Sequence, residues 1–345
     1  MLDFLKHTND LVAPSGYEMD VLGLWSDLIR PYVDEVYSDT LGNVVALRKG
    51  KALRKIMIAA HSDEIGLIIK YIDESGFLYF DEIGGVDTAL LPGRLVRIRN
   101  RKGEYVSGVI GAVPIHLQDN KSNIKELEPD QLWIDIGAAN NDEASRKVGI
   151  GDVAVLESGM LKTGSRLIGR AMDNRCSLSS MIEVARIMRD WELENDIYFV
   201  ATTQEELRAR GAQTVAFSIK PDICVVLDVT HATDYPSMSV IKRGNIALSK
   251  GVVVAVGPNM THKVSDDLIS ICQRENISFQ IEALGKPTGT DANPIQLVRS
   301  GVAVGLLSIP CRYMHSPVET IDYDDLQTVI ELLCKYIKFV DDCLN

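Results

Sequence analysis

The sequence lacks three features, and each absence argues against a class of protein. It contains no run of about 18 apolar residues, so no membrane-spanning helix is expected. Its six cysteines include no C-x-x-C pair, which argues against a disulfide framework and a thiolate zinc site and favours the reducing cytoplasm. Basic residues are also scarce: 36 Lys and Arg stand against 48 Asp and Glu, a net charge of −12. This balance excludes the usual electrostatic footprint of a nucleic-acid-binding protein and disfavours anionic membranes.

What the sequence does contain is an acidic chain of 345 residues, enough for two domains at roughly 150 residues each and for a large core. The first residues carry an acid at Asp3 and no apolar stretch of signal-peptide length, so export is not expected. We therefore predict a soluble, cytoplasmic protein.

Strand and helix patterns alternate over most of the chain. Continuous apolar runs predict buried strands at 56–60, 197–202, 223–227 and 302–309. Helical spacing of apolar residues predicts helices at 176–189, 209–218, 264–275 and 323–340. Such alternation predicts an α/β fold, a sheet covered by helices on both faces, with a functional site at the carboxyl ends of the strands.

Residues 67–166 show a different pattern. Short strand-like runs at 77–80, 95–98, 105–110, 132–136 and 153–156 are separated by Gly, Pro, Asn and charged residues, with little helix. Because the α/β pattern stops after Ala60 and resumes near Asp173, we predict a small β domain, 67–166, inserted into an α/β domain formed by 1–66 and 167–345. The polar stretch 118–130 is predicted to be a mobile loop.

Side chains that can bind metals follow the ends of the predicted buried strands. They are His61 and Asp63 after the first strand, Glu205 and Glu206 after the second, Asp228 after the third and His315 after the fourth. Asp173 begins the intervening helix. Taken singly, His61 could be a surface histidine and Asp173 a helix N-cap. Their shared placement is poorly explained by chance, and such a set suits two divalent ions such as Zn²⁺, Co²⁺ or Mn²⁺.

These residues stand among further motifs in a specific order: Pro-Ser-Gly-Tyr-Glu at 14–18, Asp-Thr-Leu-Gly-Asn at 39–43, Gly-Thr-Asp-Ala at 289–292, and the segment 312–319. Over essentially its whole length the sequence resembles the tetrahedral aminopeptidases, also described as glutamyl or deblocking aminopeptidases, which are dinuclear metallo-exopeptidases. The resemblance implies an α/β catalytic domain with a mixed sheet covered by helices, interrupted by a small inserted β-barrel-like domain. It also implies dodecameric shells whose interior active sites admit short peptides.

The resemblance also implies a role for each candidate residue. His61 and Asp228 would bind one metal ion, Glu206 and His315 would bind the second, and Asp173 would bridge both. Glu205 would act as the general base that takes a proton from the attacking water. Asp63 would orient His61.

Two departures from the family pattern affect the neighbourhood of these residues. Arg208 stands where the family usually has Gly, which places a bulky cation in the loop after the glutamate pair and leaves the substrate preference open. Asn174 replaces a frequent Asp, although Asp173 itself is present. Two further residues stay open at this stage: Asp291 is either a helix N-cap or a residue of the site, and His231 either lines the substrate pocket or lies in a surface loop.

Other functions are compatible with parts of this pattern. A carboxypeptidase or N-acyl amino acid deacylase would use the same dinuclear site with a cation, such as Arg208 or Arg312, to bind a substrate carboxylate. A catalytically silent scaffold is the second alternative, but it would have no use for the intact Glu205. A glycosidase using Glu205 and Glu206 is disfavoured, because adjacent residues seldom place carboxylates about 5–9 Å apart across one bond.

Overall fold

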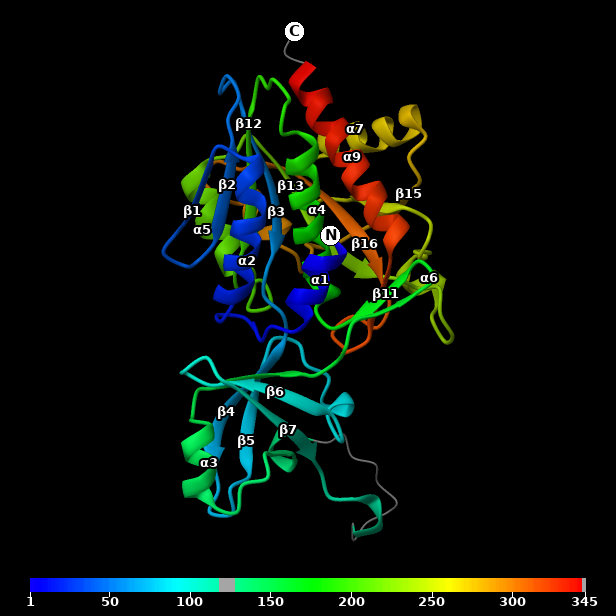
Figure 1. The fold of residues 1–345 in the computed structure, drawn as a ribbon. Helices are drawn as coiled ribbons and strands as arrows, with labels where there is room; N and C mark the ends of the chain where they lie inside the picture. Colours follow the sequence, from blue (N-terminus) through cyan, green and yellow to red (C-terminus); the bar gives the residue numbers. More distant parts are fainter. Residues whose placement is uncertain (118–127, 343–345) are drawn as a thin grey trace.

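The computed structural model describes residues 1–117 and 128–342 and consists of a large α/β part and a smaller β-barrel (Figure 1). Most of the predicted polar loop, residues 118–127, lies outside the described residues. Within the described ranges, none of the helices combines the length and apolar character needed to cross a membrane.

An eight-stranded mixed sheet forms the centre of the α/β part. In spatial order its strands are β1 (Glu35–Ser38), β2 (Val44–Arg48), β12 (Asp196–Thr202), β3 (Lys55–His61), β13 (Ile223–His231), β16 (Ala303–Cys311), β14 (Val252–Val256) and β15 (Phe279–Ala283). The four central strands, β12, β3, β13 and β16, are parallel, and antiparallel pairings with β2 and β14 flank them. Strands covered on both faces need apolar residues on both sides, which explains the continuous apolar runs in the sequence.

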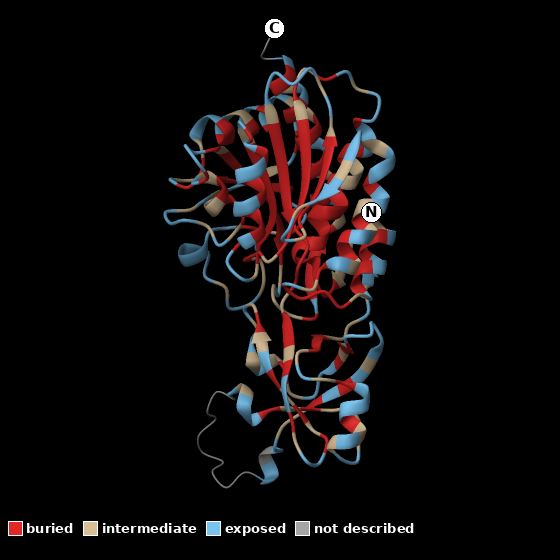
Figure 2. Cartoon of the chain, turned by 90° about the vertical axis from the view of Figure 1, so that its left-hand side faces the viewer, coloured by how far each residue is buried: buried red, intermediate tan, exposed pale blue. Residues whose placement is uncertain are grey.

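Helices cover both faces of this sheet, and Figure 2 shows its strands as the buried centre between them. One face packs against α1 (Leu2–Asn9), α2 (Met19–Ile29), α4 (Met172–Ile187), α7 (His262–Glu275) and α9 (Tyr323–Asp342). The other face packs against α5 (Arg210–Ile219) and α8 (Ala292–Gln296), while η1 (Arg30–Tyr32) and α6 (Val240–Arg243) are short peripheral turns. The predicted α/β class, a mixed sheet covered by helices, is confirmed.

The smaller part is a closed barrel with its own apolar core. Its strands, in order around the barrel, are β4 (Gly66–Ile72), β5 (Leu78–Ile83), β8 (Trp133–Asp135), β7 (Tyr105–Gly111), β6 (Leu95–Arg99) and β9 (Val153–Leu156). The connections carry η2 (Thr88–Leu90), η3 (Ile115–Leu117), η4 (Pro129–Gln131) and α3 (Asn141–Lys147). All five short strands predicted in this region are present, whereas β4 was not predicted. The division of the chain into 1–66 with 167–345 and 67–166 stays a proposal.

A third, three-stranded sheet lies where the chain returns from the barrel. It contains β10 (Leu161–Thr163), β11 (Arg166–Gly169) and β17 (Glu319–Asp322), and none of these strands was predicted. In this sheet Gly169 pairs with Glu319. Because Asp173 follows β11 and His315 precedes β17, the pairing brings two distant candidate residues to one place.

Two central strands extend at least two residues beyond their predicted carboxyl ends. The predicted strand 223–227 extends to His231 in β13, and the predicted strand 302–309 extends to Cys311 in β16. The two strands pair through Asp228 with Ser308 up to His231 with Cys311. Asp228 ends the apolar run of β13 and Pro310 ends that of β16, but neither ends the backbone pairing, so Asp228 lies within its strand and not after it.

Candidate metal centre

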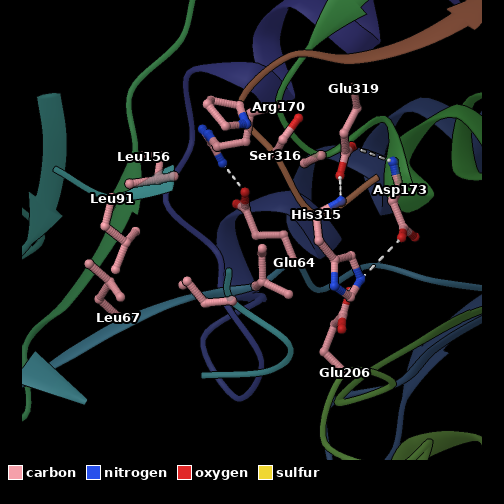
Figure 3. A pocket seen from close by; sticks show the side chains of 15 residues that line it. Glu64, Leu67, Leu91, Leu156, Arg170, Asp173, Glu206, His315, Ser316 and Glu319 are labelled. Atoms are coloured by element: carbon pink, nitrogen blue, oxygen red, sulfur yellow. Dashed lines mark hydrogen bonds and ion pairs between the residues drawn. The ribbon is translucent and has the colours of Figure 1, made fainter. Parts of the chain in front are cut away.

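Six of the seven predicted side chains lie at or shortly after the carboxyl ends of the central strands, and the seventh, Asp173, comes from the start of a helix. His61 is the last residue of β3, Asp228 lies near the end of β13, and Glu205 follows β12 by three residues. His315 comes four residues after β16, and Asp173 lies in the first turn of α4. Parallel strands deliver their carboxyl ends to one edge of a sheet, which is why residues so far apart in the sequence converge here. Figure 3 shows Asp173, Glu206 and His315 facing one another.

A first group of possible metal ligands contains His61, Asp173 and Asp228, whose donor atoms lie within 4.8 Å of one another. His61 Nε2 is 2.9 Å from Asp173 Oδ1 and 3.6 Å from Asp228 Oδ1. All three side chains are buried. Burial disfavours a positive charge on His61, but its contacts with Asp173 and Asp228 raise its pKa well above the ordinary value. The surrounding carboxylates therefore favour a cation at this position.

The second group contains Asp173, Glu206 and His315. His315 Nε2 lies 3.1 Å from Glu206 Oε1 and 3.6 Å from Asp173 Oδ2. Asp173 thus belongs to both groups and presents a different oxygen to the histidine of each. Although burial opposes its charge, the contact with Glu206 raises the pKa of His315 to about 9. Here too the arrangement favours positive charge.

The second nitrogen of each histidine faces oxygen atoms. His61 Nδ1 is 3.2 Å from the carbonyl oxygen of Asp63 and 3.4 Å from its Oδ1. His315 Nδ1 is 2.9 Å from the carbonyl oxygen of Gly85, in the barrel. A carbonyl oxygen accepts but cannot donate a hydrogen bond, so these contacts place a proton on Nδ1 and leave Nε2 as the atom available to a metal.

Asp63 does more than the sequence predicted for it. Besides its contact with His61, its Oδ1 accepts the backbone N–H of Glu205 and its Oδ2 accepts that of Glu206, each at 3.0 Å, and Ser15 donates to it as well. Burial alone would raise the pKa of this carboxyl, but the contacts with His61 and Ser15 hold it below the ordinary value. A single buried carboxylate therefore orients one histidine and fixes the loop of the glutamate pair.

Glu205 belongs to neither ligand group, although it is buried beside them, with 8% of its surface exposed. Burial raises the pKa of its carboxyl well above the ordinary value, and the nearby charges of Asp228 and Asp291 add to the effect. A carboxylate in this setting has an increased tendency to accept a proton, which is the property a general base needs.

The residues left open by the sequence have different surroundings. Asp291 precedes α8 but makes no side-chain hydrogen bond to it, and its Oδ2 accepts the hydroxyl of Thr202 at 2.5 Å. His231 ends β13 and is exposed. Arg312 donates from Nε and Nη2 to the carboxylate of Asp234, at 2.8 and 2.7 Å. This pairing occupies one of the two cations, Arg208 and Arg312, that a carboxylate-binding hydrolase was expected to use.

Two buried groups beside the centre were missed at the level of sequence. Glu319 accepts the backbone N–H groups of Asp173 and His315. Glu64 pairs with Arg170 and, at 3.0 Å, with Arg175. In the sequence, only the positions of these residues could have pointed to them. Glu319 is the last residue of the segment 312–319, which contains His315. Glu64, Arg170 and Arg175 each lie within three residues of a candidate ligand.

An apolar pocket opens beside the second ligand group (Figure 3). The barrel contributes Leu67, Leu91 and the neighbouring Val86 to its wall, together with Leu156. Asp173, Glu206 and His315 lie along the same pocket, as do Arg170 and Glu319. The barrel therefore forms part of the immediate surroundings of the candidate centre.

Replacing Gly85 by alanine is expected to disturb His315. A Cβ atom at this position would lie 3.1 Å from Nδ1 of His315, closer than side chains normally approach. We expect a roughly tenfold weaker Co²⁺ affinity, the scale of losing a contact that orients a ligand. Calorimetric titration of metal-stripped protein with Co²⁺ measures it. Gly159→Ala is the control, since a Cβ there meets nothing within 4 Å. Equal Co²⁺ affinities of the two variants would refute the role of this contact.

Comparison with known proteins identifies similar sequences and structures. The sequence model of the family described as M42 glutamyl aminopeptidase matches residues 42–332. The lysyl aminopeptidase of Pyrococcus furiosus is 39% identical over 336 residues, which are 96% of this chain and 94% of that protein. The structure of aminopeptidase APDkam598 from the archaeon Desulfurococcus kamchatkensis has a TM-score of 0.91 and 37% identity, covering 97% of this chain and 93% of that one.

A further similar structure concerns assembly. The TET1 peptidase of Pyrococcus horikoshii has a TM-score of 0.87 and 30% identity, with 97% of this chain and 98% of that chain covered. That peptidase is described as able to assemble into a tetrahedron or a large octahedral shell.

Proposed function

The chain belongs to the M42 family of glutamyl aminopeptidases, and from this we propose that it removes N-terminal residues from short peptides with two divalent ions and Glu205 as general base. The observation that carries the proposal is the sharing of Asp173 between two ligand groups, with Glu205 buried beside them but in neither. A structural metal site has no need of such a carboxylate.

The ligand groups fit divalent metal ions of borderline hardness. Each offers one imidazole nitrogen and two carboxylates, the ligand types that Zn²⁺, Co²⁺ and Mn²⁺ accept. His61, Asp173 and Asp228 would hold one ion, and Asp173, Glu206 and His315 the other. When bound, the ions would supply Lewis acidity that polarises the scissile carbonyl and lowers the pKa of water towards about 7.

The protein side chains have separate tasks in this proposal. Glu205 accepts the proton of the attacking water and passes it to the amine that leaves. Asp63 keeps Glu205 in place through the backbone N–H of that residue and keeps His61 turned so that Nε2 faces the centre. The surplus of buried carboxylates attracts the free α-amino group of a peptide, a group that an internal peptide bond lacks. This requirement would make the enzyme an exopeptidase.

A carboxypeptidase or N-acyl amino acid deacylase is supported less well, because Arg312, one of its two candidate cations, is bound by Asp234 and not free to hold a substrate carboxylate. The other candidate, Arg208, is exposed in the loop after the glutamate pair, so the alternative is left to the test on acetylated substrates. By similarity to the assembly of the TET1 peptidase we propose a homo-oligomer, a dodecameric shell, for this chain as well. Its cytoplasmic location stays a prediction.

The test is hydrolysis of a panel of aminoacyl anilides by metal-stripped protein, before and after addition of Zn²⁺, Co²⁺ or Mn²⁺. We expect activity to return with at least one ion and to be absent on the N-acetylated forms of the same anilides. Equal cleavage of free and acetylated substrates would contradict the aminopeptidase, and activity unaffected by metal removal would contradict the metal centre.

A further inference from the structure

Glu319 is a buried carboxylate to which the proposed chemistry gives no task. It is the first residue of β17, and 3% of its surface is exposed. Its Oε2 accepts the backbone N–H of Asp173 at 3.0 Å, and its Oε1 accepts that of His315 at 2.9 Å. Both hydrogen bonds are visible in Figure 3. One side chain thus joins the backbones of two residues from the second ligand group.

Regular structure does not hold either backbone at these two positions. Asp173 has non-helical angles, φ −75° and ψ 101°, within the first turn of α4, where N–H groups have no partner inside the helix. His315 has φ +61°, in the left-handed region that a non-glycine residue adopts at a cost. The pairing of β11 with β17 ends at Gly169 and Glu319. Beyond this point, the carboxylate of Glu319 accepts a backbone hydrogen bond from each segment.

We propose that Glu319 is a positioning residue, which fixes Asp173 and His315 at the separation that the second metal ion requires. The inference rests on the proposed function, because it assumes that this group binds a metal. It adds a residue that touches neither the ion nor the substrate and acts only through two ligand backbones.

Both oxygens of Glu319 have to be acceptors for this role. Glutamine has nearly the same shape, but its amide presents one acceptor and one donor. In Glu319→Gln one of the two backbone N–H groups would therefore face another N–H group, and that segment would move away. The first ion depends only on the segment of Asp173, whereas the second depends on the segments of both Asp173 and His315. The effect on metal binding should therefore be largest at the second ion.

Asp341 offers a matched control at the other end of the sheet. It is also buried, with 8% of its surface exposed, and its carboxylate accepts the backbone N–H groups of Glu194 and Asn195 at 2.9 and 3.0 Å. These residues precede β12 at its amino end, whereas the candidate centre lies at the carboxyl end. Asp341→Asn removes the same kind of double contact without touching the centre.

The experiment is calorimetric titration of Co²⁺ into metal-stripped wild type, Glu319→Gln and Asp341→Asn, with thermal unfolding of each metal-free protein. We expect both variants to unfold at a lower temperature than wild type. Only Glu319→Gln should weaken Co²⁺ binding, raising one of the two dissociation constants about 10- to 100-fold. In Asp341→Asn both constants should stay within about twofold of wild type.

Wild-type Co²⁺ constants in a folded Glu319→Gln protein would overturn the proposal, and so would equal weakening in Asp341→Asn. Failure of the wild type itself to bind any of Co²⁺, Zn²⁺ and Mn²⁺ would instead overturn the proposed function, together with this inference. Should Glu319→Gln not fold, Glu319→Asp keeps two acceptor oxygens on a stem one methylene shorter. It is then expected to raise the same dissociation constant at least about threefold, and an unchanged constant would count against Glu319.

Discussion

Glu205→Gln is expected to bind both metal ions with wild-type affinity and to lose nearly all turnover. Glutamine preserves the size of the side chain but cannot accept a proton from the attacking water. Loss of a general base typically lowers the rate by about 10²- to 10⁴-fold. Because Glu205 belongs to neither ligand group, its loss should leave the ions in place. Turnover of an aminoacyl anilide and Co²⁺ titration, measured on the same preparation, test both halves of the prediction.

The adjacent glutamate supplies the contrast. Glu206 is a member of the second ligand group, so Glu206→Gln should weaken metal binding as well as turnover. Glu194→Gln, at the amino end of β12, should change neither. If Glu205→Gln kept its turnover, the base would be another residue. If it lost a metal ion, Glu205 would be a ligand and the assignment of the pair would be reversed.

The central part of the fold was predictable because of how its strands are buried. β3, β12, β13 and β16 are covered on both faces, so continuous apolar runs mark them in the sequence. β10, β11 and β17 contain at most two apolar residues each, too few to mark a strand in the sequence. This is why β10, β11 and β17 were missed, although their sheet determines where Asp173 and His315 meet.

The candidate ligands were predictable for a related reason. Their residue types are distinctive, and each follows a strand whose direction the α/β pattern predicts. The supporting contacts were not predictable, because they depend on three-dimensional proximity between segments far apart in the chain. Glu319 accepts from Asp173 across 146 positions, and Asp63 accepts from Glu205 across 142. Nothing in the local sequence distinguishes such a carboxylate from one on the surface.

Asp173→Ala is expected to abolish binding of both ions, because its two oxygens serve the two ligand groups. Each group would retain only one histidine and one carboxylate, and we expect both Co²⁺ dissociation constants to rise by at least about 100-fold, more than for loss of a supporting contact. Lewis-acid stabilisation contributes several kcal/mol, and about 1.4 kcal/mol corresponds to tenfold in rate, so turnover should fall by roughly 10³-fold or more. Metal content and anilide hydrolysis measure the two effects.

Asp228→Ala is the comparison that isolates the shared role. Asp228 is as deeply buried as Asp173, with 5% against 6% of its surface exposed, but it belongs to the first ligand group alone. Removal of this carboxylate should therefore weaken the binding of one Co²⁺ ion and leave the affinity for the other near that of the wild type. Loss of a single ion from Asp173→Ala would mean that Asp173 does not bridge. Loss of both from Asp228→Ala would mean that the two ions bind only together, and the independent groups inferred from the geometry would have to be replaced by one cooperative site.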